Sequence, residues 1–245
     1  MKQTDHSLLE KMNIKSDAII GNQCEYNSIE SFEWNNHLIK YLNFAERGVG
    51  LNRNNALMRA NGDVCLFADD DIVFCDDYVE VITNSFNDCP DADVIVFNLY
   101  ENDTTRYVIK KKSKVGYFNY LRYGTARIAI KLNSIKTAGI SFNLCFGGGT
   151  DHCHGEDNLF LTDCLKHGLK IYAMPRYIAS LTGERESTWN KGFNKKYLED
   201  QGFLYKNISR KYWRALVLQD AIRHHRDYKM SFMEAYRVML SGGRK

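Results

Sequence analysis

The sequence contains little proline, no closely spaced cysteine pair and no long apolar run. Only Pro90 and Pro175 are present, and no stretch rich in serine, glycine or proline divides the chain, so disorder is not expected away from its ends. No apolar segment has the length of a membrane span or the position of a signal-peptide core. The seven cysteines form no C-x-x-C pair and several lie in apolar runs, which favours free thiols over disulfides. These absences predict a cytoplasmic protein.

The composition is that of a globular protein with a core, because 44% of the 245 residues are apolar and 26% are charged. The charge is unevenly distributed. Residues 1–184 carry 19 Lys and Arg against 24 Asp and Glu, whereas residues 185–245 carry 14 against 6. A basic segment of this kind is typical of contact with an anionic partner, such as the inner face of the plasma membrane or a phosphate-bearing acceptor. A solvated helical face explains the same charges, and the sequence leaves the choice open.

Apolar periodicity predicts alternating strands and helices over most of the chain. Short apolar runs typical of buried strands occur at residues 17–21, 64–68, 93–97 and 169–173, and helical patterns occur at 5–13, 52–60, 77–87 and 155–167. This order predicts an α/β fold with a mixed, mainly parallel sheet flanked by helices. A half-exposed strand is expected over 126–130, and helices over 212–225 and 231–240. We therefore expect an α/β domain, residues 1–184, and a basic helical extension, residues 185–245.

Asp69, Asp70 and Asp71 follow directly after the predicted strand 64–68. Ligands of open α/β sheets bind beyond the carboxyl ends of the strands, and three adjacent carboxylates repel one another unless a cation or protons relieve them. A hard divalent cation binds one or two carboxylates together with phosphate oxygens of a substrate. An acidic turn that caps the following helix is the structural alternative, and the buried strand in front favours the cation site.

Glu156 and Asp157 open the predicted helix 155–167, shortly after a glycine-rich stretch. Carboxylates at a helix N-terminus are favoured by the helix dipole, and one held there can accept a proton from a hydroxyl group as a general base. Plain N-terminal capping is the alternative. Because glycine permits close approach of the backbone to a ligand, Gly148 and Gly149 are candidate acceptor-binding residues.

Two histidines and an arginine complete the set of candidates. His152 and His154 lack the spacing of a zinc site, and we expect them to contact the substrate. Arg53 follows Gly48 and Gly50 at the start of the predicted helix 52–60, where both a helix N-terminus and a guanidinium group bind phosphate. The glycine spacing matches neither a P-loop nor a dinucleotide fingerprint.

These motifs, in this order, resemble those of glycosyltransferase family 2, whose members are inverting enzymes with a GT-A fold. The stretch from Gly48 to Gly62 is similar to the family's segment of Gly, Arg-Asn and Ala-x-Gly. Val64–Asp71 is similar to its strand ending in Asp-x-Asp, and Gly155-Glu156-Asp157 is similar to its catalytic-base segment. The resemblance covers about residues 5–180. It implies sugar transfer from a nucleotide donor, a UDP-sugar in the first instance, to a saccharide or lipid-linked acceptor in cell-surface polysaccharide or glycolipid synthesis, and no nucleic-acid partner.

The resemblance also implies roles for the candidate residues. Asp71 would ligate Mn²⁺ or Mg²⁺ with help from Asp69, and Asp69 and Asp70 would border the donor. Asp157 would be the base that deprotonates the acceptor hydroxyl, with Glu156 as the second candidate. Arg53 would lie near the nucleotide or its diphosphate.

Two departures from the family pattern affect these expectations. Asn22 and Gln23 stand where the family often has acidic residues that contact the nucleotide, so they are the candidate donor contacts here. The family's first strand has no counterpart, because Met1 falls almost directly at the first predicted helix. The sequence therefore leaves open an active transferase, a non-catalytic remnant that binds a nucleotide or a partner without turnover, and another metal-dependent nucleotide enzyme such as a nucleotidyltransferase.

Overall fold

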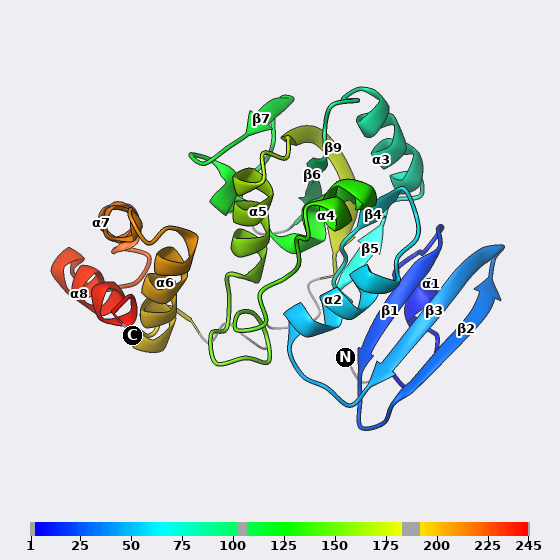
Figure 1. Ribbon diagram of the computed structural model, residues 1–245, viewed down its shortest axis with the longest axis horizontal. Helices are drawn as coiled ribbons and strands as arrows, with labels where there is room; N and C mark the ends of the chain where they lie inside the picture. Colours follow the sequence, from blue (N-terminus) through cyan, green and yellow to red (C-terminus); the bar gives the residue numbers. More distant parts are fainter. Residues whose placement is uncertain (1–2, 102–106, 183–191, 245) are drawn as a thin grey trace.

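The computed structural model describes residues 3–101, 107–182 and 192–244, and it arranges them as two β-sheets with helices packed around them (Figure 1). The smaller sheet lies at one end of the molecule and the C-terminal helices lie at the other, with the larger sheet between them. The helices are α1 (Leu8–Lys11), α2 (Val49–Arg59), α3 (Tyr78–Asn87), α4 (Leu132–Thr137), α5 (Glu156–Lys166), α6 (Lys195–Ile208), α7 (Trp213–His224) and α8 (Phe232–Gly242).

The larger sheet has the strand order β4-β8-β6-β9-β5, and β7 also pairs with β9. Its strands are β4 (Val64–Leu66), β5 (Ile72–Phe74), β6 (Val94–Tyr100), β7 (Ser113–Val115), β8 (Ile128–Lys131) and β9 (Ile171–Leu181). β6 and β9 are parallel, whereas β4/β8, β6/β8, β5/β9 and β7/β9 are antiparallel. The predicted mixed α/β class is confirmed, but the expectation of mainly parallel pairing is wrong.

The cause of that error lies in β6, whose residues from Val94 to Phe97 are wholly buried. Ile95 and Phe97 face a core shared with α3, and Val94 and Val96 face a second core shared with α4 and α5. Each such aliphatic side chain contributes about 1.5–3 kcal/mol on burial. Because both faces are covered, β6 is a continuous apolar run, and such a run reports burial on both faces without fixing the direction of the neighbouring strands.

The smaller sheet has the order β1-β3-β2, with β1 (Ala18–Gln23) parallel to β3 (His37–Phe44) and β2 (Ser28–Trp34) antiparallel to it. Asn35 and Asn36 join β2 to β3, and both have positive φ, 49° and 64°. Positive φ at both central residues is the mark of a type I′ hairpin turn, whose twist matches that of the strands. The sequence reasoning predicted β1 but missed this hairpin.

Several predicted elements are confirmed to within a few residues. Helices α2, α3, α5, α7 and α8 lie where the periodicity predicted them. The strand predicted at 169–173 corresponds to the start of β9, which continues to Leu181. Of the predicted helix 5–13, only α1 is helical. Gly168, with φ of 75°, follows the end of α5 as expected of a C-terminal glycine.

The three C-terminal helices share an apolar core, which Phe146 and Leu159 of the preceding chain join. At the crossing of α6 and α8 the backbones touch: a Cβ on Gly202 would lie 1.8 Å from the carbonyl oxygen of Met239, and one on Gly242 would lie 1.9 Å from that of Glu199. Only glycine permits such an approach. The expected domain boundary at residues 184 and 185 lies outside the described residues.

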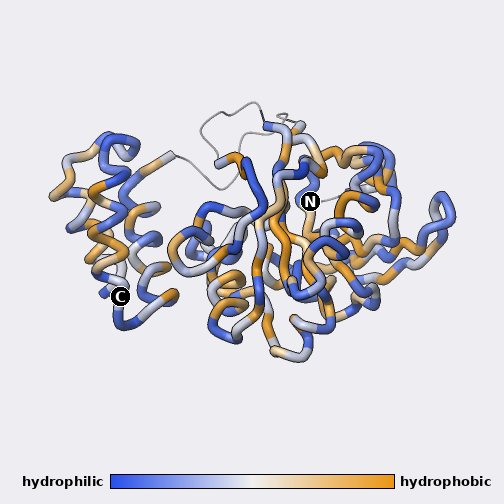
Figure 2. The backbone as a smooth tube through the Cα atoms, turned by 90° about the horizontal axis from the view of Figure 1, so that it is seen from above, coloured by the Kyte–Doolittle hydropathy of each residue, from blue (hydrophilic) through white to orange (hydrophobic). Residues whose placement is uncertain are grey.

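Among the described residues, the longest helix is α6 with 14 residues, and none of the helices is both long and apolar enough to cross a bilayer. Figure 2 shows the apolar strands gathered in the middle of the molecule and mixed polar and apolar helices at its end.

Candidate functional site

The acidic triplet forms the turn between β4 and β5, at the carboxyl end of β4 as predicted. All three aspartates are partly buried. The backbone N–H and the hydroxyl of Thr182 donate to the carbonyl oxygen of Asp71 at 3.0 and 3.1 Å, which ties the turn to the end of β9. The turn is therefore fixed at its start by β4 and at its end by the hydrogen bonds to Thr182 after β9.

Arg53 joins this turn to the helix that carries Glu156 and Asp157. Its Nη2 donates to Asp69 Oδ1 at 2.7 Å, and its Nη1 donates to Glu156 Oε1 at 2.8 Å. The guanidinium also lies over the ring of Phe142, 5.4 Å from its centre. Burial alone would lower the pKa of Arg53, but the carboxylates of Asp69 and Glu156 outweigh it and raise the pKa. Residues far apart in the sequence thus meet at one buried cation.

The start of α2 places Arg53 there. Gly48, with φ of 113°, precedes the helix, and the N–H of Val49 donates to the carbonyl oxygen of Gly148 at 2.8 Å. A Cβ on Gly50 would lie 2.7 Å from the carbonyl oxygen of Asn143. The glycines of the motif therefore serve close packing of α2 against the 142–149 segment.

The predicted helix N-terminus at Glu156 and Asp157 is confirmed, and it follows Gly155, whose φ is 106°. Burial, followed by the charge of Glu156, raises the pKa of Asp157 to about 7, although the N–H of Asn158 and the cation of Arg53 oppose this. A carboxyl group that titrates near neutral pH is well matched to general-base work at physiological pH. Asp157 is therefore the better candidate for a general base, whereas Glu156 is engaged by Arg53.

The glycine loop fills the space between α2 and the acidic helix. A Cβ on Gly147 would lie 2.5 Å from Val49 and 2.8 Å from the carboxylate of Glu156, and one on Gly149 would lie 2.9 Å from the backbone nitrogen of Gly48. Gly148 and Gly149, the predicted acceptor contacts, thus pack against the start of α2, whereas Gly147 borders Glu156. The contacts that their backbones make are with other residues of the chain.

His152 and His154 are held by α6. His152 Nδ1 lies 2.7 Å from Asp200 Oδ1, and its ring stacks on that of Phe203. His154 Nε2 lies 2.7 Å from Gln201 Oε1, and burial lowers the pKa of His154. The helical extension therefore supports the loop that leads into Glu156 and Asp157. The sequence analysis did not predict this contact between α6 and the two histidines.

Asn22 and Gln23 lie at the end of β1 with buried side chains, 2% and 5% exposed. Asn22 Nδ2 donates to Asn43 Oδ1 at 2.8 Å, and Gln23 Nε2 donates to the carbonyl oxygen of Gly48 at 2.9 Å. In this arrangement the amide groups hold β1 against β3 and the start of α2. The structure thus brings together Arg53, Asp69, Glu156 and Asp157, with Asn22 and Gln23 in supporting positions.

Two further residues border Asp157 that sequence reasoning did not single out. A Cβ on Gly124 would lie 3.7 Å from Asp157 Oδ2, so the backbone there passes close to the carboxylate. Asn158 Oδ1 is buried and has no hydrogen-bond partner among the described residues. Since a buried carbonyl oxygen is costly when unpaired, Asn158 is a candidate for contact with a ligand hydroxyl group or a water molecule. No sequence signal marks either position.

No group of three or more His, Cys, Asp and Glu side chains is arranged to hold a metal ion within the part of the chain that the structure describes. The donor chemistry of the triplet still fits a hard cation, because Mg²⁺ is commonly bound by one or two carboxylates plus substrate phosphates. Asp69 is engaged by Arg53, and Asp71 stays the ligand that the family resemblance implies.

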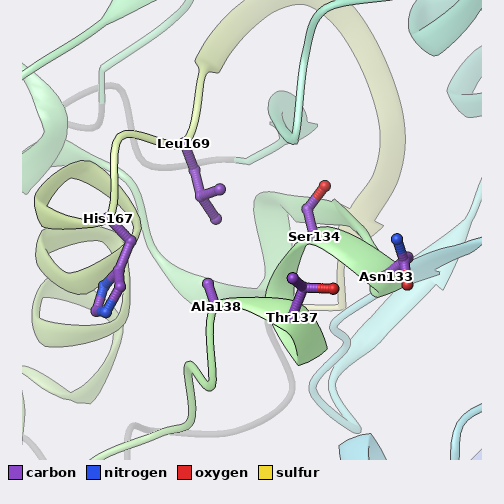
Figure 3. A pocket seen from close by; sticks show the side chains of 6 residues that line it. All are labelled: Asn133, Ser134, Thr137, Ala138, His167 and Leu169. Carbon is purple, nitrogen blue, oxygen red and sulfur yellow. The ribbon is translucent and has the colours of Figure 1, made fainter.

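The surface also has a hollow of about 430 Å³, whose lining side chains are drawn in Figure 3. It is lined by Asn133, Ser134, Thr137 and Ala138 of the α4 region and by His167 and Leu169. His167 follows the last residue of α5, whereas Glu156 and Asp157 are in its first turn. The hollow and the candidate site therefore lie at opposite ends of that helix.

The mixed sheet with flanking helices has the architecture of the GT-A fold, as the comparisons with known proteins show. The profile described as "Glycosyl transferase family 2" matches residues 24–146, which is 123 of the 245 residues. The chain belongs to that family, and the resemblance read from its motifs is confirmed.

Solved structures support the fold. The crystal structure of S. aureus TarS 1-349 in complex with UDP-GlcNAc is similar with a TM-score of 0.57 and 14% identity, over 85% of this chain and 75% of that one. The same protein in complex with UDP has a TM-score of 0.55 and 15% identity, over 86% and 75%. No curated protein sequence matches the chain significantly.

Proposed function

We propose that this glycosyltransferase moves a sugar from a nucleoside-diphosphate donor, a UDP-sugar in the first instance, to a hydroxyl acceptor with inversion. One observation carries the proposal: Arg53 binds Asp69 of the acidic turn and Glu156 of the acidic helix at once, at 2.7 and 2.8 Å. A donor-binding turn and a base are thereby held next to each other. The complexes of TarS with UDP-GlcNAc and UDP support the choice of donor.

The chain's own residues supply the base. Asp157, beside Glu156 and with a pKa raised to about 7, is ionised in a substantial fraction at neutral pH and accepts the proton of the acceptor hydroxyl. The oxygen then attacks the anomeric carbon from the side opposite the departing nucleoside diphosphate, which inverts the configuration at that carbon. Because residue 124 is glycine, no side chain stands between its backbone and this carboxylate.

The role of the acidic turn is to bind the donor. Asp71, with Asp69 assisting, would hold Mn²⁺ or Mg²⁺, and such a cation offsets charge on a leaving diphosphate. Arg53 is committed to two carboxylates, so its role is to set the position of Asp69 and Glu156 and to moderate their repulsion.

The acceptor and the location of the protein belong to the same proposal. We place a saccharide or lipid-linked acceptor of cell-surface polysaccharide or glycolipid synthesis beside Gly148, Gly149, His152 and His154, which lie in the segment that leads into Glu156 and Asp157. All seven cysteines are free thiols, which fits the cytosol.

The decisive experiment measures nucleoside-diphosphate release from a panel of sugar nucleotides with a set of acceptors, with and without Mn²⁺. We expect turnover that needs the cation, that is reduced strongly in Asp71→Asn, and that is reduced in Asp157→Asn while donor binding persists. Donor binding without turnover in the presence of every acceptor would favour the non-catalytic alternative. Activity that survives both EDTA and Asp71→Asn would refute the metal role.

A further inference from the structure

Helix α7 presents an apolar stripe to solvent. Its inner face packs Trp213, Val217 and Ala221 into the core of the C-terminal helices. Its outer face carries Leu218 and Ile222, which are 40% and 57% exposed and lie about one turn apart. A surface helix normally carries polar residues on the side away from the core. The outer stripe is therefore apolar surface that no described residue covers.

Cations border this stripe. Arg214, Arg223 and Arg226 are exposed on α7 and in the turn that follows it. Arg210 and Lys211, also exposed, precede the helix beside Tyr212, which is 58% exposed. We call Tyr212, Leu218, Ile222 and these five cations the α7 outer face.

Few acidic residues accompany the cations of the α7 outer face along the chain. Between residues 210 and 226 the one acidic residue is Asp220, which is buried on the inner side and accepts hydrogen bonds from Tyr205 and Tyr228. Asp227 lies just beyond and is within hydrogen-bond distance of His224. The face is strongly positive as well as apolar.

We infer that the α7 outer face docks on a membrane surface that contains anionic lipid. Helices that lie in a bilayer interface combine an apolar stripe with flanking Lys and Arg, and their binding grows with both buried apolar area and attraction to anionic headgroups. A soluble polyanion would engage the arginines and leave Leu218 and Ile222 in water, so the exposed stripe favours lipid. With 12 residues, α7 is about 18 Å long and rests on the interface at the end of the molecule (Figure 1).

The full chain tests this in a vesicle flotation assay at physiological salt. We expect binding to vesicles of phosphatidylcholine with 30% phosphatidylglycerol and little binding to phosphatidylcholine alone. Replacing Arg214, Arg223 and Arg226 by Gln should weaken partitioning by about 100-fold, since each cation near such a surface contributes roughly a factor of five. A control triple, Lys11→Gln, Lys136→Gln and Lys166→Gln, makes the same change in net charge at exposed positions elsewhere and should keep most of the binding.

The apolar stripe is tested separately by Leu218→Ser with Ile222→Ser. We expect at least a tenfold loss of vesicle binding, whereas Leu38→Ser with Met58→Ser, at exposed apolar positions on other elements, should leave it unchanged. Circular dichroism of each variant checks that it is folded. Equal loss in the control triple, or wild-type binding to long-chain inorganic polyphosphate that exceeds vesicle binding and ignores the serine substitutions, would overturn lipid docking. Because no sugar donor is present, the result does not depend on the proposed transferase activity.

Discussion

Leu204 of α6 occupies the space where residue 155 would carry a side chain: a Cβ on Gly155 would lie 2.7 Å from both Leu204 methyl carbons. The contact is made next to the two carboxylates of α5. The C-terminal helices thus pack directly against the start of α5.

Gly155→Ala should destabilise the protein by about 1–3 kcal/mol, because it combines overpacking with an unfavourable positive φ. It should also lower transfer activity, since the first turn of α5 has to shift. Denaturant unfolding measures the first effect. Gly139→Ala is the control, because φ there is 66° and nothing lies within 4 Å of the added carbon. If the free energy of unfolding falls equally in the two variants, the positive φ alone explains the loss and overpacking against Leu204 does not destabilise the protein.

The transfer rate should rise with pH through an acid limb near 7, as the carboxyl group of Asp157 loses its proton. Glu156→Gln removes the largest charge that raises this pKa and should move the limb to lower pH. Carbon-13 NMR of the Asp157 carboxyl group measures the same shift without substrate. A limb that stays in place in this variant would contradict the assignment.

The raised pKa of Asp157 also predicts how stability depends on pH. Because the folded-state pKa of about 7 exceeds the ordinary aspartate pKa of 3.8, the folded protein binds more protons between the two values. This group's contribution to the free energy of unfolding should therefore fall as the pH rises from about 4 to 7 and level off above. Asp157→Asn should remove that component, which parallel denaturant titrations of both proteins reveal.

Arg53→Met should cost about 2–4 kcal/mol, because it leaves Glu156 and Asp69 without their shared cation. The lower part of this range allows for the Asp69 side chain, which is 44% exposed. The variant should also raise the pKa of Asp157 further, since Arg53 lowers it.

Arg47→Met is the matched control for Arg53. Arg47 pairs with Glu25 at the surface, and such pairs contribute about 0–1 kcal/mol. Equal unfolding midpoints for the two variants would show that the Arg53 bridge is not structural.

Asn158→Ala separates stability from function. Its buried Oδ1 lacks a partner among the described residues, so removing it should change the free energy of unfolding by less than about 1 kcal/mol. If this oxygen binds the acceptor hydroxyl, the variant should raise the KM for the acceptor while the donor KM stays the same. A change in the donor KM alone would contradict an acceptor contact and would indicate that Asn158 contacts the donor.

The sequence was informative where a local pattern carries the information. An apolar run predicts strand β6, a glycine just after the helix predicts the end of α5, and a cluster of aspartates predicts the turn at Asp69. Each prediction holds to within a few residues. The direction of strand pairing was not predictable in this way, because the residues of β8 that pair with β6 lie 32 to 36 positions further along the chain, and an apolar run is the same in either direction.

The candidate site shows the same division. Arg53 was recognised as a charged group near the donor side, but its two carboxylate partners lie 16 and 103 residues away, beyond any local pattern. Asn22 and Gln23 were chosen by position in the chain, whereas their burial against Asn43 and Gly48 depends on the pairing of β1 with β3. The hairpin turn at Asn35 and Asn36 could have been found from its two asparagines, which tolerate positive φ.

The glycine crossing of α6 and α8 bears on the order in which the protein matures during synthesis. The acidic turn and the strands around it can fold as soon as residue 182 has emerged, whereas α6 is fixed only when Gly202 and Gly242 have met their partners on α8 and α6. Since α6 in turn holds His152 and His154, the loop before Asp157 is completed last. Folding that proceeds from the N-terminus would therefore build the acidic turn on the ribosome and complete the loop before Asp157 near the end of translation.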